Sequence, residues 1–147
     1  MNDISLRKIT KDTLGKFLRM KVHPAQEDFV APNGSSIAQG EYNDDAWYRG
    51  IYAGEEPVGF AMLSIMEDKA EYYLWRFMIG AEHQRKGYGK AAMEKIIEYV
   101  RILPNAKELS LSHVESNVEA AAFYKLLGFT HTGEKDEHGE MMMVLKL

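Results

Sequence analysis

The first half of the chain alternates between apolar runs and polar, turn-forming stretches, which predicts short strands and helices. Ile4, Leu6 and Ile9 are spaced as in an opening strand, and Thr10 or Asp12 is a suitable cap for the helix that follows. That helix is expected to have Leu14, Phe17, Leu18 and Met20 on its apolar side, and prolines break the loop that follows it over 22–36. A short helix is expected near 35–45. Two strands, at 47–53 and 58–65, should then form a hairpin about a turn at 54–57.

The second half contains the longest strand-like run, residues 71–79, whose bulky side chains are typical of a central strand buried on both faces. A helix from 87 to 101, a strand at 109–113, a helix over 118–127 ended by Gly128, and a hairpin of strands 129–134 and 140–147 are expected to follow. Strand, helix and strand from 71 to 113 make a right-handed βαβ unit with parallel strands, whereas the hairpins are antiparallel. We therefore predict an α/β (α+β) fold: one domain over 1–147, with a mixed central sheet and helices on both faces.

Composition narrows the class of protein. The chain has 147 residues, 46% of them apolar, which suffices for a core without disulfide or metal staples. It contains no cysteine, which excludes disulfides, thiolate metal sites and a catalytic thiol. The net charge of −4 argues against a general nucleic-acid binder, which needs a basic face. The first ten residues hold no apolar run of the signal-peptide kind, and no stretch is long enough for a membrane span, so we expect a cytoplasmic protein.

The segment 84–90 carries the most chemical information in the chain. Gly87 and Gly89 at a helix start leave backbone amides unpaired, and Arg85, Lys86 and Lys90 add three cations around them. Phosphate is the natural ligand of such a turn. The alternative is a tight strand-to-helix turn with solvated charges beside it.

Two other phosphate-binding patterns fit this segment less well. A P-loop requires Ser or Thr after its Gly-Lys pair, and here Ala91 follows Lys90. Gly87, Gly89 and Ala92 match the dinucleotide pattern, but a polar stretch separates them from the preceding strand, and the chain has room for only half of such a fold.

Two motifs in this chain resemble those of the GNAT superfamily of N-acetyltransferases. Gln84, Gly87 and Gly89, after a strand ending at 76–79, form a Gln-x-x-Gly-x-Gly pattern similar to the pyrophosphate-binding motif of that superfamily. Asn117 and the run over 120–129 resemble its second signature. Element order is similar over nearly the whole chain, and the length also resembles the bacterial spermine/spermidine acetyltransferase branch.

The resemblance implies acetyl-CoA as cofactor and transfer of its acetyl group to an amine. The main chain of Phe77, Met78 and Ile79 would bind the pantetheine arm as an added strand does. The residues that the resemblance assigns to the cofactor diphosphate are Gln84, Arg85, Lys86, Gly87, Tyr88, Gly89 and Lys90. Asn117 would bind the cofactor near its reactive end, and Tyr124 would protonate the leaving thiolate.

Chemistry independent of the resemblance agrees with this role for Tyr124. The unperturbed pKa values of a thiol and a phenol are about 8.5 and about 10, so proton transfer between them is not steeply uphill. Spacing alone would make Tyr124 a core aromatic. Because the chain lacks cysteine, an acetyl-cysteine intermediate is impossible, and direct attack of the amine in a ternary complex is the simplest route.

The base that deprotonates the amine has no clear candidate. Many relatives place a glutamate on the long central strand, but the nearest positions here are Tyr73 and Trp75, with Glu71 earlier on the same face. Glu71 therefore remains the candidate for the base. The alternative is that Glu71 is a solvated carboxylate at the end of the strand. The five histidines lack ligand spacing, so no metal is expected.

The acceptor is predicted from the distribution of charge. Residues 22–56 carry a net −6 and the remainder +2. In the resembling fold this segment covers the acceptor side, so we predict a small-molecule amine, a polyamine such as spermidine or spermine. The acceptor candidates are Glu27, Asp28, Glu41, Glu71 and Trp75, whereas Glu55 and Glu56 are typical of an ordinary turn. The alternative is a solvated acidic face.

Three functions stay open at this point. They are a polyamine or other small-amine acetyltransferase, a protein or peptide acetyltransferase, and a non-catalytic sensor module that binds CoA. A homodimer is compatible with edge strands near the C-terminus, although no sequence feature requires one.

Overall fold

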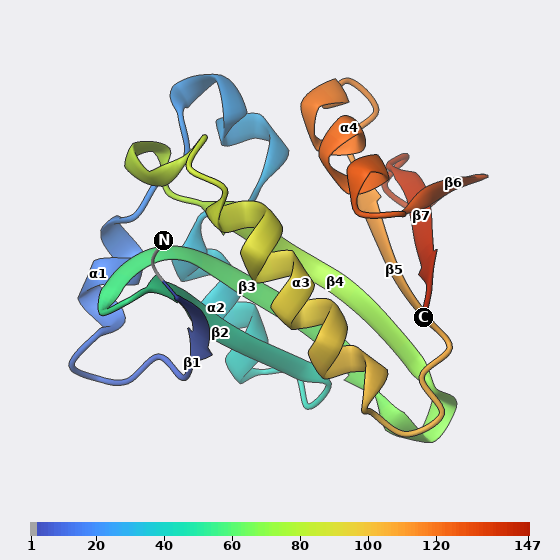
Figure 1. Cartoon of the computed structure of the whole chain (residues 1–147), viewed down its shortest axis with the longest axis horizontal. Helices are drawn as coiled ribbons and strands as arrows, with labels where there is room; N and C mark the ends of the chain where they lie inside the picture. The colour runs from blue at the N-terminus through green and yellow to red at the C-terminus, as the bar shows by residue number, and fades with distance from the viewer. Residues whose placement is uncertain (1–2) are drawn as a thin grey trace.

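A mixed sheet with strand order β1-β2-β3-β4-β5-β7-β6 runs through the molecule, seen in a computed structural model that describes residues 3–147 (Figure 1). The strands are β1 (Ile4–Arg7), β2 (Ala46–Ala53), β3 (Glu56–Met66), β4 (Glu71–Ile79), β5 (Glu108–His113), β6 (Thr130–Lys135) and β7 (Met141–Lys146). The helices are α1 (Leu14–Arg19), α2 (Asn33–Glu41), α3 (Tyr88–Arg101) and α4 (Val118–Leu126), with 3-10 turns η1 (Pro24–Phe29), η2 (Glu67–Lys69) and η3 (Ala81–His83). Strands β4 and β5 pair in parallel and the other neighbours pair antiparallel, which confirms the predicted mixed sheet.

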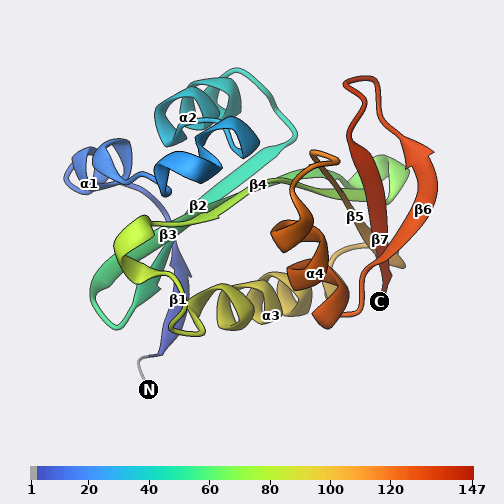
Figure 2. The ribbon, with the colours of Figure 1, turned by 90° about the horizontal axis from the view of Figure 1, so that it is seen from above.

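The helices cover both faces of the sheet, as predicted (Figure 2). Helices α1 and α2 lie on one face, and α3 and α4 lie on the other. The side chains of α3 that face the sheet keep the helical spacing seen in the sequence: Ala92, Met93, Ile96, Ile97 and Val100 are all buried. A smaller cluster around Phe60, Met62 and Met78 fills the face under α1 and α2. The two apolar layers hold β3 and β4 rigidly at the centre of the molecule.

Strand β4 has the bounds that the sequence predicts, but it is not buried throughout. Residues 75–77 are half-buried, and the register with β3 shifts there, because Met62 pairs with Arg76 whereas Leu63 pairs with Leu74. Trp75 is therefore the extra residue of a β-bulge on β4. A bulge bends its strand, which positions the site described below.

The N-terminal helices differ from their predictions. Neither Thr10 nor Asp12 caps α1: Thr13 precedes the helix, and its hydroxyl accepts a hydrogen bond from the backbone amide of Thr10 at 2.9 Å. Of the expected apolar side only Phe17 is buried, and Leu18 is 49% exposed. The predicted loop contains η1, which begins at Pro24, where the fixed φ of proline favours a helical start.

Helix α2 begins two residues earlier than expected. The side chain of Asn33 is buried and donates to the carbonyl oxygen of Phe17 at 2.9 Å, so packing against α1 sets the start of α2. The predicted end of α4 is correct, since Gly128 has a φ of +104°, which glycine adopts without strain. No helix within the described part of the chain has the length and apolarity needed to cross a membrane.

Candidate functional site

The site is built where β4 and β5 separate. The two strands pair only at Tyr73 with Ser110 and at Leu74 with Leu111, immediately before the bulge at Trp75, and they diverge beyond it (Figure 1). On the side of β5, the later residues of β4 therefore have no strand partner within residues 3–147. Main-chain donors and acceptors at such an edge bind an extended ligand as a further strand would be bound. The predicted pantetheine-binding residues Phe77, Met78 and Ile79 lie on this stretch.

The glycine turn lies between the end of β4 and the start of α3. The side chain of Gln84 donates to the carbonyl oxygen of Ile79 at 2.9 Å and exchanges hydrogen bonds with Gln26 of η1 at 2.9 and 3.2 Å. Arg85 and Gly87 have φ values of +62° and +83°, so the backbone turns sharply before the helix. These contacts hold the turn against the edge of β4.

The amides of this turn are available to a ligand. Within residues 3–147, the backbone N–H groups of residues 85–90 donate to no backbone acceptor. Arg85, Lys86 and Lys90 are exposed, and no ion pair of the described chain includes them. Unpaired amides at the N-terminus of a 14-residue helix, surrounded by three cations, fit a diphosphate. The turn thus has the chemistry that the sequence predicts for it.

Tyr124 lies on α4, the helix whose Phe123 ring stacks on that of Phe77 of β4. Tyr124 is 9% exposed and packs against Phe123 and Phe129 with ring centroids 5.2 and 5.7 Å away. Desolvation by burial, together with the nearby Tyr73, raises the pKa of Tyr124 well above its usual value. The phenol consequently stays protonated at neutral pH, as a proton donor must, although the raised pKa makes it a weaker acid than a free phenol.

Asn117 has a clear structural role as the N-cap of α4. Its side-chain oxygen accepts a hydrogen bond from the amide of Ala120 at 3.3 Å. The side chain amide is half-buried at the end of α4 that follows β5. The cap fixes the start of the helix that carries Tyr124.

A cavity of about 460 Å³ lies at the start of β4 on the sheet face opposite α3. Glu71 and Tyr73 line it together with Glu108 and Ser110 of β5. Glu71 and Tyr73 share a face with Trp75, as the sequence predicts, but Trp75 packs against the cluster around Phe60 instead of lining this cavity. Glu71 is exposed at the end of the strand.

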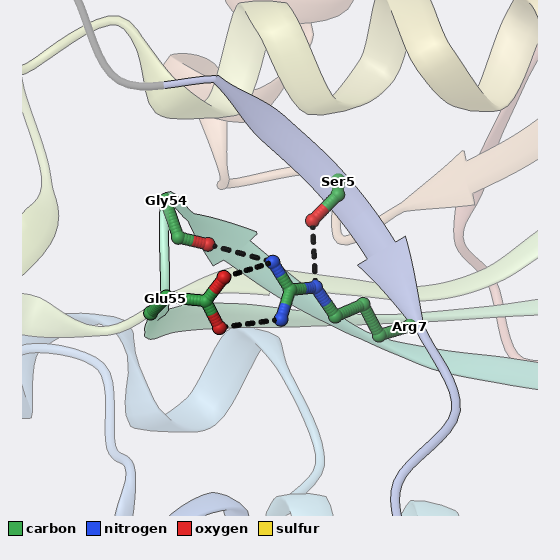
Figure 3. Close-up of polar contacts among 4 residues, drawn as sticks. All are labelled: Ser5, Arg7, Gly54 and Glu55. Atoms are coloured by element: carbon green, nitrogen blue, oxygen red, sulfur yellow. Dashed lines mark hydrogen bonds and ion pairs between the residues drawn. The ribbon is translucent and has the colours of Figure 1, made fainter.

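The carboxylates of the acidic segment 22–56 are distributed over several elements, among them η1, α2 and the turn between β2 and β3. Glu55 pairs with Arg7 at 2.9 Å, and Arg7 also donates to the carbonyl oxygen of Gly54 and to the hydroxyl of Ser5 (Figure 3). The Arg7 hydrogen bond and charge lower the pKa of Glu55. Glu55 is therefore a turn residue held by β1, as predicted.

The three acceptor candidates of this segment lie on two separate elements. Glu41, on α2, accepts a hydrogen bond from the hydroxyl of Tyr48. Glu27 and Asp28 are exposed on η1, next to Gln26, which bonds Gln84 at the glycine turn. Within residues 3–147, no three His, Asp or Glu side chains are grouped as metal ligands.

Sequence reasoning missed a polar cluster that joins β4, β5 and the β6–β7 hairpin. Tyr73, Ser112 and Glu140 form it through their side chains. The signal in the sequence is the alternation of Leu109 and Leu111 with serines, which gives β5 a polar face. Glu140 has no such signal, because it follows a turn.

Comparisons with known proteins agree with this geometry. The model of the acetyltransferase (GNAT) family matches residues 11–129. The spermine/spermidine N(1)-acetyltransferase of Bacillus subtilis strain 168 is 29% identical over 152 residues, which span 98% of this chain and 99% of that protein.

Solved structures share the fold. The spermidine N-acetyltransferase of Vibrio cholerae, in complex with CoA and spermine, has a TM-score of 0.78 at 16% identity, covering 98% of this chain and 95% of that one. The PaiA N-acetyltransferase of Thermoplasma acidophilum, in complex with coenzyme A, has a TM-score of 0.68 at 20% identity, with 99% of both chains covered.

Proposed function

The chain belongs to the GNAT acetyltransferase family, and we propose that it transfers the acetyl group of acetyl-CoA to a primary amine of a polyamine. The observation that carries the proposal is the separation of β4 from β5 beside Tyr124. The elements around this separation supply an unpaired strand edge, a turn with unpaired amides and three cations, and a buried phenol. The two solved structures described above, which are complexes with CoA, support acetyl-CoA as the cofactor.

The residues present fit this cofactor. The amides of residues 85–90 and the cations Arg85, Lys86 and Lys90 would hold the diphosphate, and the edge at residues 77–79 would bind the pantetheine amides. When bound, acetyl-CoA supplies an activated thioester. Tyr124 would hold a proton for the departing sulfur, and Asn117 would orient the helix that carries this phenol.

A polyamine acceptor is supported by two observations. The spermine/spermidine N(1)-acetyltransferase relative matches nearly the full length of both chains. The sheet face opposite α3 also carries Glu71 at a cavity, and a carboxylate attracts an extended cation, whereas Glu108 at the same cavity is paired with Lys146. Direct attack of the amine in a ternary complex requires no covalent enzyme intermediate, consistent with a chain that lacks cysteine.

The experiment is a thiol-release assay with acetyl-CoA and a panel of acceptors: spermidine, spermine, an aminoglycoside and a lysine peptide. We expect the polyamines to have the highest kcat/KM. Faster turnover of the lysine peptide would replace the polyamine proposal with a protein or peptide acetyltransferase. Tight CoA binding without turnover of any amine would indicate a CoA sensor instead.

A further inference from the structure

A chain of hydrogen-bonded side chains runs from the site to the β6–β7 hairpin. The hydroxyl of Tyr73 on β4 lies 2.5 Å from the hydroxyl oxygen of Ser112 on β5. Ser112 in turn donates to the carboxylate oxygen Oε1 of Glu140 at 3.4 Å. Three residues from three separate elements thus connect the centre of the sheet to a half-exposed carboxylate.

The inner end of this chain lies at the point where β4 and β5 separate. Tyr73 and Leu74 are the two residues of β4 that pair with β5, and the bulge at Trp75 follows them directly. Tyr73 and Tyr124 belong to opposite faces of the sheet, yet the two phenols are close enough that Tyr73 contributes to the raised pKa of Tyr124. Tyr73 therefore lies at the start of the strand edge to which the proposed function assigns the pantetheine arm.

The outer end is held by the hairpin itself. The Oδ1 atom of Asp136 accepts hydrogen bonds from the amides of His138 and Glu140, both at 2.9 Å. Desolvation raises the pKa of Asp136, but the hydrogen bonds that it accepts, first among them the one from the Glu140 amide, outweigh this effect, and the net pKa is lowered. Asp136 is thus an ionised anchor for the turn. The groups that face Glu140 are this carboxylate, Tyr73 and Arg76, whose guanidinium adds a positive charge from β4.

We propose that Glu140 is the terminal acceptor of the proton that the acceptor ammonium loses, and that the hydroxyls of Tyr73 and Ser112 relay it. The inference rests on the proposed function and supplies the base that sequence reasoning left open. Glu71, the earlier candidate, has no hydrogen-bonded connection to the point of strand separation within residues 3–147.

The ammonium N–H bond breaks and its proton goes to the Tyr73 oxygen, while the Tyr73 proton moves to Ser112 and the Ser112 proton moves to Glu140. The neutral amine then forms a bond to the thioester carbon, the C–S bond breaks, and the sulfur takes the bonding pair and the proton of Tyr124. The new amide nitrogen returns its second proton to Tyr124, and Glu140 releases its proton to water. The sum is ammonium plus thioester to amide, thiol and one proton.

The test is Glu140→Gln, which keeps the size and hydrogen-bonding capacity of the side chain but cannot take a proton at neutral pH. Glu137→Gln is the matched control, because Glu137 lies in the same hairpin with its side chain 86% exposed. Steady-state kcat and KM would be measured with a short diamine and with spermine, across the pH range up to the pKa of the amines. Unfolding midpoints and CoA affinity of each variant would be measured alongside.

We expect kcat of Glu140→Gln to be about 100-fold lower at neutral pH with both acceptors, the usual size of a general-base contribution. The deficit should shrink as pH rises, since solution then supplies neutral amine. CoA affinity should not change, and Glu137→Gln should match the unmodified chain. Tyr73→Phe should show the same pH-dependent loss, and the double variant should lose no more than either single variant.

Three results would overturn the proposal. The first is a decrease in kcat that is the same at every pH, and the second is no decrease in kcat at all. The third is an effect confined to the KM of spermine, which would make Glu140 a binding residue for a distal ammonium. If Glu140→Gln does not fold, the Tyr73→Phe profile decides alone. Failure of the unmodified chain to turn over any amine would instead refute the proposed function.

Discussion

The two glycines of the turn are expected to respond to alanine in opposite ways. Gly87 has a φ of +83°, and a Cβ there meets nothing within 4 Å, so strain of the left-handed backbone is the whole cost. Gly87→Ala should therefore lower the free energy of unfolding by about 1–2 kcal/mol. Gly89 lies in the first turn of α3 without a positive φ, and alanine there should raise it by about 0.5–1 kcal/mol.

The effect of Gly89→Ala on cofactor binding should be unfavourable despite that gain in stability. The added Cβ would lie 3.5 Å from Cζ of Phe123 and 3.6 Å from Cγ1 of Ile79, which are ordinary contacts. It would thus occupy the space between β4 and α4, along the path assigned to the pantetheine arm. We expect CoA to bind at least 10-fold more weakly, a loss of about 1.4 kcal/mol.

Urea unfolding and calorimetric titration with CoA separate the two quantities. A stable Gly89→Ala chain that binds CoA as tightly as the unmodified chain would refute the assignment of this path. The same conclusion would follow if CoA affinity simply followed stability, falling in Gly87→Ala and not in Gly89→Ala.

Three further changes test other parts of the account. Tyr124→Phe should lower kcat about 100-fold with CoA affinity unchanged, because the ring packing stays and only the proton is lost; a full rate in the thiol-release assay would exclude the acid role. Gly50→Ala should cost about 1–3 kcal/mol in urea unfolding, because the new Cβ would lie 2.3 Å from Cζ of the buried Phe17; unchanged stability would mean that this ring is loosely held. His131 and His113 place their Nε2 atoms 2.8 Å apart, and desolvation, then the charges of His113 and a nearby lysine, lower the pKa of His131. Since the imidazole of His131 then binds a proton more readily in the unfolded chain than in the folded one, the free energy of unfolding should fall as pH drops through roughly 6.5. His131→Gln should make this dependence of stability on pH less steep. The same pH dependence in the variant and the unmodified chain would contradict the pairing of the two histidines.

The sequence predicts the central elements of the fold well because their patterns are strong. Strand β4 and helix α3 have the expected cores, since a bulky run bounded by polar turns and a helical apolar spacing leave few alternatives. Helix α1 is short and leaves Leu18 half exposed, so its pattern is weak and its cap was misassigned.

The site was predictable only where local motifs define it. The glycine turn and the helix of Tyr124 are local motifs, and the structure brings them to the same region. The separation of β4 from β5 depends on a bulge and on strand register, which no local pattern specifies. Glu140 reaches Ser112 only through the pairing of β5 with β7, so a sequence reading sees it merely as the end of a turn.

The central claim is that one acetyl group passes from acetyl-CoA directly to a polyamine amine on this chain. Mass spectrometry of a reaction with acetyl-CoA and spermidine, with free thiol measured in parallel, tests it most directly. We expect one acetylated polyamine for each thiol released and no acetylated protein intermediate. Thiol release without acetylated polyamine, or a covalent acetyl-enzyme that precedes the product, would contradict it.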